Sequence, residues 1–174
     1  MMIKKILIMF TIFCTLSEIR AQFEMDITKE ELKELPFKKR LTFNVGGGIT
    51  FGTITNINLQ PQVGYRLTPR LTYGLGANYQ YFKDNRFLGN SIQIFGGNTF
   101  LRCSIAQQLF LQTEYQMLNY DYNTVGRTWN DYALLGGGYS PGGGFSISAF
   151  YLLKYPANNN IYVQPFVLRV GIGF

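Results

Sequence analysis

The sequence contains no histidine, and this absence removes much of the common enzymatic and metal-binding chemistry. Histidine is the usual general base of serine and cysteine hydrolases and the commonest side-chain metal ligand. Of the two cysteines, Cys14 lies in a segment typical of an export signal, so Cys103 is alone in the expected mature chain. A lone cysteine forms no intramolecular disulfide, and without an activating histidine we expect no catalytic thiol.

Long apolar runs and dense charge are also missing. A helix needs about 20 apolar residues to cross a bilayer. The longest run here, residues 6–16, is shorter, and the mean hydropathy is +0.01. Charged residues make up 15% of the chain and the formal net charge is +6. These values exclude a helical membrane bundle, and so weak and scattered a positive charge does not indicate nucleic-acid binding.

The first residues have the pattern of a secretory signal peptide. Lys4 and Lys5 precede the apolar run, and Ala21 is a small residue suited to the cleavage site. We therefore predict a signal peptide over residues 1–21; the alternative is a retained membrane anchor. A lipoprotein signal is discounted, because Phe13 stands where a small residue would precede Cys14.

Residues 22–40 form a short arm that differs from everything after it. The arm holds five acidic residues, and Thr28 with Glu31 fits a capping box at the start of a helix. Leu32 and Leu35 supply apolar positions, and Pro36 would end the helix. We expect either a mobile arm or a segment that docks on a partner through Thr28, Glu31, Leu32 and Leu35, since so short a helix is marginal alone.

From residue 41 to residue 174 the sequence alternates with a period of two, the pattern of β-strands. The chain has 19 glycines, 12 tyrosines and 15 phenylalanines, which favour strands joined by tight turns. Glycines hide the alternation of the sixth segment. We predict eight strands, at residues 41–51, 57–67, 71–81, 95–105, 109–117, 131–139, 145–155 and 162–174.

The lengths of these segments and their connections predict a transmembrane barrel. A tilted strand crosses the hydrocarbon layer in about 9–11 residues, whereas soluble strands average about five or six. Tight turns near Pro69, Ala106 and Pro141 alternate with longer links at 83–90 and 121–130. We therefore expect an all-β, antiparallel up-and-down barrel of eight strands in the outer membrane, with short turns and both termini in the periplasm.

Charge decides between this barrel and a soluble, lipocalin-like one. Residues 41–174 contain eight Lys or Arg and four Asp or Glu, which is about 9% of that segment. A soluble exterior carries roughly 25–35% charged residues. Tyrosine and phenylalanine also gather toward the strand ends, as in the interfacial girdles of membrane barrels. We expect the apolar faces to contact outer-membrane lipid and the Gly, Thr, Ser, Asn and Gln faces to fill the interior.

The last strand strengthens a resemblance to a known group. It alternates apolar residues and ends in phenylalanine, and the residues concerned are Phe166, Leu168, Val170, Ile172 and Phe174. With the preceding strands it resembles the OmpA-like and OmpX-like eight-stranded outer-membrane barrels over residues 41–174. The resemblance implies that this strand is the signal read by the barrel-assembly machinery during insertion.

Five charged residues fall on the polar faces of the strands. They are Arg66, Arg102, Glu114, Lys154 and Arg169. An unpaired charge inside a barrel is costly, so we expect Glu114 to pair with one or more arginines as a plug. The alternative is a narrow path that favours anions, although eight strands leave an interior that side chains just fill. Residues 136–144 are glycine-rich but lack the Lys-Ser/Thr ending of a phosphate loop.

No catalytic, cofactor or metal site is expected, and we predict that the protein is not an enzyme. The preferred hypothesis is a structural or interaction barrel, with a second outer-membrane or periplasmic protein as partner. The arm motivates it, as does a predicted exposed loop containing Arg127 and Trp129. A conduit for small solutes is the alternative. A lipid-modifying barrel enzyme is a third hypothesis, which the missing histidine disfavours.

Overall fold

The structure is a computed structural model that describes residues 29–50, 54–86, 91–121, 126–142, 144–154, 161 and 165–173. Eight antiparallel strands close into one barrel, which confirms the predicted all-β, up-and-down fold. The strands are β1 Leu41–Thr50, β2 Ile54–Arg66, β3 Leu71–Asp84, β4 Ser91–Ser104, β5 Leu109–Asp121, β6 Arg127–Gly142, β7 Phe145–Lys154 and β8 Phe166–Gly173.

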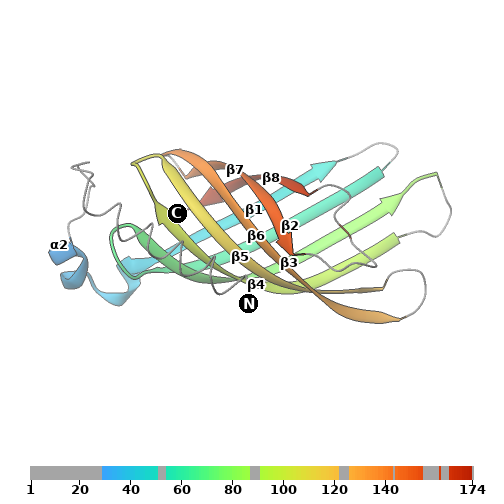
Figure 1. Ribbon diagram of the computed structural model, residues 1–174, viewed down its shortest axis with the longest axis horizontal. Coiled ribbons are helices and arrows are strands. Elements are labelled where there is room, and N and C mark those ends of the chain that lie inside the picture. The colour runs from blue at the N-terminus through green and yellow to red at the C-terminus, as the bar shows by residue number, and fades with distance from the viewer. Residues whose placement is uncertain are drawn as a thin grey trace.

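Each strand pairs with the next in the chain, and β1 pairs with β8 to close the cylinder (Figure 1). The tight turns predicted after β2 and β4 are present, where the backbone N–H of Leu71 donates to Thr68 and that of Leu109 donates to Ala106. We call the end that carries these turns the short-turn end and the opposite end the long-loop end. The signal segment 1–21 and residues 22–28 lie outside the described residues.

Several boundary predictions are wrong: β2 begins at Ile54 rather than residue 57, β3 runs on to Asp84, and β4 begins at Ser91 rather than residue 95. The sequence predicted a loop over 121–130, but β6 already begins at Arg127 and is the longest strand of the barrel. Trp129 pairs with Asn119, and Thr128 pairs with Tyr120. The β5–β6 ladder continues because β5 also extends to Asp121, so the hairpin runs on past the predicted strand ends.

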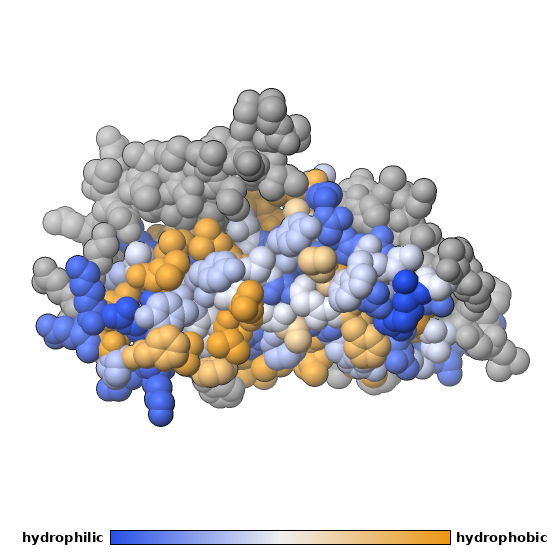
Figure 2. Space-filling view, turned by 90° about the horizontal axis from the view of Figure 1, so that it is seen from below, coloured by the Kyte–Doolittle hydropathy of each residue, from blue (hydrophilic) through white to orange (hydrophobic). Residues whose placement is uncertain are grey.

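The two faces of the strands differ as the alternation predicted. Apolar side chains at every second position lie on the exterior; examples are Phe43, Leu75, Ile147 and Leu168. In Figure 2, hydrophobic and weakly polar residues occupy the middle of the displayed face, and strongly hydrophilic residues gather toward its two ends. Polar side chains instead fill the centre of the interior, where Gln60, Gln62, Gln112, Glu114 and Gln116 are buried.

At the long-loop end the interior is apolar. A cluster of buried side chains fills it, contributed by β4, β5, β6 and β7: Ile94, Leu118, Tyr120, Tyr132, Leu134, Phe150 and Leu152. The hydroxyls of Tyr120 and Tyr132 are hydrogen-bonded to each other at 2.7 Å, so these two fully buried groups satisfy one another.

Glycines on the inner face make space for aromatic rings. A Cβ at Gly138 would collide with the ring of Phe110, and a Cβ at Gly74 would collide with Phe100. At Gly136 a Cβ would approach a ring carbon of Phe150 to 2.6 Å. The glycine run in β6 that hid the alternation of the sixth strand therefore serves ring packing.

Two short helices precede the barrel, the α-helix α2 Lys29–Glu34 and the 3-10 helix η1 Phe37–Arg40. The short helix expected within the arm is present and ends before Pro36, as predicted. Figure 1 places α2 beyond the short-turn end of the barrel. Within the described residues, no helix combines the length and the hydropathy needed to cross a membrane.

Candidate functional site inside the barrel

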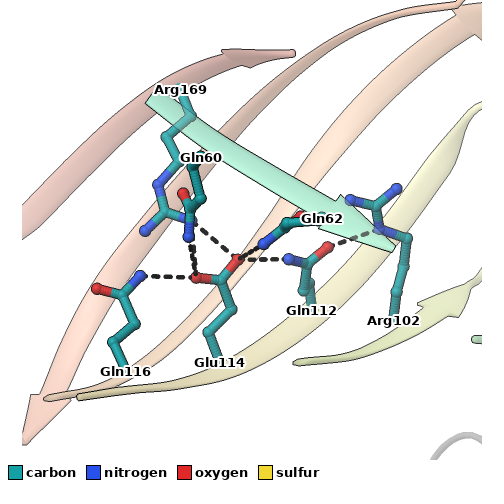
Figure 3. Close-up of polar contacts among 7 residues, drawn as sticks. All are labelled: Gln60, Gln62, Arg102, Gln112, Glu114, Gln116 and Arg169. Atoms are coloured by element: carbon teal, nitrogen blue, oxygen red, sulfur yellow. Dashed lines mark hydrogen bonds and ion pairs between the residues drawn. The ribbon is translucent and has the colours of Figure 1, made fainter. Parts of the chain in front are cut away.

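A single carboxylate, that of Glu114, lies at the centre of the interior polar cluster. Because side chains of a strand alternate, Gln112 and Gln116 of β5 share its face. Gln60 and Gln62 of β2 and Arg169 of β8 reach the same point from other parts of the barrel wall (Figure 3). Barrel closure thus brings together residues that are far apart in the sequence.

The carboxylate of Glu114 is held mainly by Arg169. Nη1 of Arg169 donates to both carboxylate oxygens, at 2.8 and 2.7 Å. The Arg169 guanidinium also lies over the ring of Phe150, with its carbon 4.5 Å from the centroid. Both members of the pair are buried, and a charge pair away from water is stable only when its remaining polar atoms are satisfied.

The side-chain amides of four glutamines make the remaining hydrogen bonds to the Glu114 carboxylate. The amide of Gln116 donates to Oε2 at 2.9 Å and that of Gln112 donates to Oε1 at 2.5 Å. Gln62 and Gln60 complete the set at 3.3 and 3.5 Å. The carboxylate accepts hydrogen bonds from five side chains, so both of its oxygens are fully engaged.

Arg102 is connected to Glu114 through the side chain of Gln112. Its Nε donates to Oε1 of Gln112 at 2.6 Å, and Gln112 in turn donates to Glu114. The Arg102 guanidinium lies over the ring of Phe110 at 4.4 Å and, in Figure 3, on the far side of Gln112 from Glu114. Arg66 is separate from the cluster and lines a cavity at the short-turn end.

The space left beside Glu114 and Arg169 is small. Cavities of about 20 and 10 Å³ adjoin Glu114, Arg169 and Gln116. A cavity needs about 10–15 Å³ to hold one water molecule. The interior around Glu114 and Arg169 therefore has room for little more than single water molecules, and the arrangement is that of an ion-paired plug.

The expected interior position of Lys154 is wrong. Lys154 forms an ion pair with Asp131, and both side chains are partly exposed on the outside of the barrel. The Tyr115 hydroxyl also donates to Asp131, at 2.9 Å. A register shift in the β6–β7 ladder explains the error: Leu134 pairs with Leu152, but Ala133 pairs with Lys154. The extra residue, Leu153, moves Lys154 to the other face.

The arm lies against its own barrel. Leu32 is 3% exposed and lines the cavity at the short-turn end, and Leu35 is half-buried. The ring of Phe37 stacks on Tyr65 at 5.2 Å, and Nη1 of Arg40 donates to the Tyr65 hydroxyl at 3.1 Å. Thr28 and the side chain of Glu31 lie outside the described residues, so the capping box is not among the described contacts.

The remaining predicted surface residues lie on strands. Trp129 is 64% exposed near the start of β6. Arg127 is exposed and donates from Nε to Oδ1 of Asn119 at 2.7 Å. In β8 the side chains of Phe166, Leu168, Val170 and Ile172 all face outward, while Phe174 lies outside the described residues.

The four glutamines around Glu114 were not singled out from the sequence. Their signal was present, because Gln60 and Gln62, and likewise Gln112 and Gln116, occupy alternate positions on polar strand faces. Which polar faces meet across the barrel depends on closure and register, which no local pattern carries. In the described part of the chain, no group of three or more His, Cys, Asp or Glu residues is placed to hold a metal ion.

No family model matches this chain, and no curated protein matches it significantly.

Proposed function

We propose that the protein is an integral β-barrel of the bacterial outer membrane, similar in architecture to the OmpA-like and OmpX-like barrels. The observation that carries the proposal is the inverted polarity of the barrel. Leu168 is 79% and Phe166 is 66% exposed, whereas the charged pair of Glu114 and Arg169 is buried. A soluble barrel of this size places its apolar face inward and rarely exposes so continuous an apolar surface to water.

The proposed orientation places the short-turn end and both termini in the periplasm, as in bacterial barrels with short periplasmic turns. Residues 1–21 would act as the export signal. The outward-facing apolar residues of β8 would present the signal for the barrel-assembly machinery. Outer-membrane lipid would then contact the exterior apolar side chains.

The proposed molecular role is structural or interactive, with the barrel as an accessory subunit of an outer-membrane complex. The long-loop end supports this role, because Trp129 is exposed on the long β5–β6 hairpin. Exposed tryptophans are strongly enriched among residues that dominate binding energy at interfaces. The proposal includes no catalytic activity, since the sequence has no histidine.

A conduit for solutes has less support, because the Glu114 cluster leaves cavities of only about 20 and 10 Å³. We expect planar bilayers containing the purified protein to show no stepwise conductance at neutral pH. Steps that disappear when Glu114 is replaced would contradict the plug and favour the conduit.

The membrane location is tested by fractionation of cells that express the full chain. We expect the mature protein, without residues 1–21, to remain with outer membranes after washing with urea and carbonate. Its migration in SDS gels should change when the sample is boiled, as is usual for a barrel that resists SDS. A folded, monodisperse protein in the aqueous fraction without detergent would overturn the proposal.

The interaction role is tested by a photo-crosslinking amino acid placed at Trp129 in living cells. The matched control carries the same probe at Leu168, which is even more exposed but lies on the exterior wall. We expect a discrete protein adduct from position 129 and only lipid adducts from position 168. If neither position gives a protein adduct and the barrel always extracts alone, the role as a subunit is wrong.

A further inference from the structure

The short-turn end of the barrel encloses a cavity that the Glu114 plug does not use. Its volume is about 320 Å³, within the range of small-molecule sites. The arm covers one side of it with Leu32, and the barrel wall supplies mainly polar side chains. The lining includes Thr42, Arg66, Thr72, Arg102, Ser104 and Ser140.

Two guanidinium groups line this cavity, and neither forms an ion pair with a described residue. The half-buried side chain of Arg66 forms no hydrogen bond or ion pair with any described residue. Arg102 uses only its Nε, which donates to Gln112, so both of its Nη groups lack hydrogen-bond partners in the described structure. An arginine that is largely removed from water and unpaired is costly, which suggests that its partner is a ligand.

The charges of the interior do not balance. Glu114 is the one buried acid among the described residues, and Arg169 already occupies both of its oxygens. Arg66 and Arg102 therefore leave about two positive charges at the short-turn end.

A second cavity extends the first toward the centre of the barrel. Its volume is about 200 Å³, and it shares Thr42, Arg66, Arg102 and Ser140 with the first. Asn44 also lines it, and the Oδ1 atom of Asn44 is buried without a hydrogen-bond partner. Since the amide of Asn44 can be turned to present either its oxygen or its nitrogen, it can accept from or donate to a ligand oxygen.

We propose that this cavity binds a phosphate group, held between Arg66 and Arg102. A phosphate dianion matches the two excess positive charges, and guanidinium groups bind its oxygens through paired N–H donors. Thr42 and Ser140 add hydroxyl donors from β1 and β6. The site goes beyond the proposed membrane role and does not depend on it. The two arginines line a cavity inside the barrel, whether lipid or water surrounds the exterior.

The test is isothermal titration of the full chain, purified in neutral detergent, with inorganic phosphate. We expect saturable binding of one phosphate per barrel. Arg66→Gln should weaken binding at least tenfold. Arg66→Lys should give an intermediate loss, because lysine keeps the positive charge but lacks the paired N–H donors of the guanidinium. Lys38→Gln removes the same charge from the exposed side of η1, which does not line the cavity, and should change binding less than twofold.

A second titration distinguishes the source of the phosphate. Mixed micelles containing phosphatidylglycerol present it on a lipid, and micelles containing phosphatidylcholine are the control. Binding that depends on Arg66 to either free phosphate or phosphatidylglycerol supports the site and identifies its source. The proposal is overturned if neither probe binds, or if Arg66→Gln and Lys38→Gln weaken binding equally. Circular dichroism of each variant verifies that the barrel is folded.

Discussion

The two ends of the barrel interior are closed in opposite ways. The long-loop end is filled by apolar side chains such as Leu134 and Phe150, whose burial is nearly complete. The short-turn end instead holds a polar cavity of about 320 Å³ with Arg66 and Arg102 in its wall. β4, β5 and β6 line both ends, so on these strands the difference lies in which residues occupy the inward positions.

The comparison teaches how a small barrel separates packing from recognition. Apolar packing at one end is stable without a partner, because each side chain is covered by its neighbours. Unpaired arginines at the other end gain stability only when an anion arrives. The Glu114 cluster lies between them and keeps the two environments apart. Four substitutions test this division, beginning with the cluster itself.

The largest effect is expected from Glu114→Gln. The variant leaves the Arg169 cation buried without its counter-charge, and removal of one partner of a buried pair costs about 3–5 kcal/mol of unfolding free energy. Urea unfolding in detergent, followed by circular dichroism, measures it. The double variant Glu114→Gln with Arg169→Gln removes both charges and should recover much of the loss. An equal loss in the single and double variants would contradict the charge-pair explanation.

Leu134→Ala tests the apolar end. Leu134 is buried in the cluster at the long-loop end, and large-to-small substitutions in a core cost about 2–5 kcal/mol. Leu168→Ala makes the same chemical change on the exterior and should cost less than about 1 kcal/mol in detergent, because little protein packs on it. Similar losses at the two positions would mean that the long-loop end is not a packed core.

Gly138→Ala tests the ring packing near the short-turn end. The new Cβ would meet the ring of Phe110 and lie 2.7 Å from the carbonyl oxygen of Ile147. Such overpacking costs about 1–3 kcal/mol. A Cβ at Gly48 meets no atom within 4 Å, so Gly48→Ala is the matched control and should leave the urea midpoint unchanged or slightly higher. A neutral Gly138→Ala would show that the Phe110 ring can move away.

The smallest effect is expected from Asp131→Asn. It removes the exposed ion pair with Lys154 while keeping a side chain of similar size. Exposed ion pairs contribute little, so the urea midpoint should stay within experimental error of the original protein. A loss comparable to that of Glu114→Gln would show that the exterior pair is as shielded from water as the interior one.

Much of the fold was predictable because each strand obeys a local rule. Eight alternating segments, the tight turns and the outward positions of Phe166, Leu168 and Ile172 all follow from the period of two. The pattern failed where one residue breaks the period. The register shift at Leu153 reversed the face of Lys154, and nothing local to the sequence marks it.

The candidate site was predictable only in part. The alternation identified Glu114, Arg102 and Arg169 as inward charges, but the partners of each depend on barrel closure. The glutamines were visible on polar faces, yet their convergence on one carboxylate needs the relative heights of β2, β5 and β8 around the cylinder. The cavity was not predicted, because the arm that covers it was expected to be mobile or to dock on a partner, and not to pack against its own barrel.

The join between β1 and β8 has a consequence for how the molecule is made. Among the described residues four pairs span it, from Asn44 with Gly173 to Gly47 with Val170, whereas β3 and β4 are paired along nearly their full length. Because these two strands come from opposite ends of the barrel sequence, the join can form only after all the intervening hairpins exist. Until then the backbone N–H and C=O groups along the outer edges of β1 and β8 are unpaired, and either edge can pair with another strand. We therefore expect the short β1–β8 ladder to form last during folding and to separate first during unfolding.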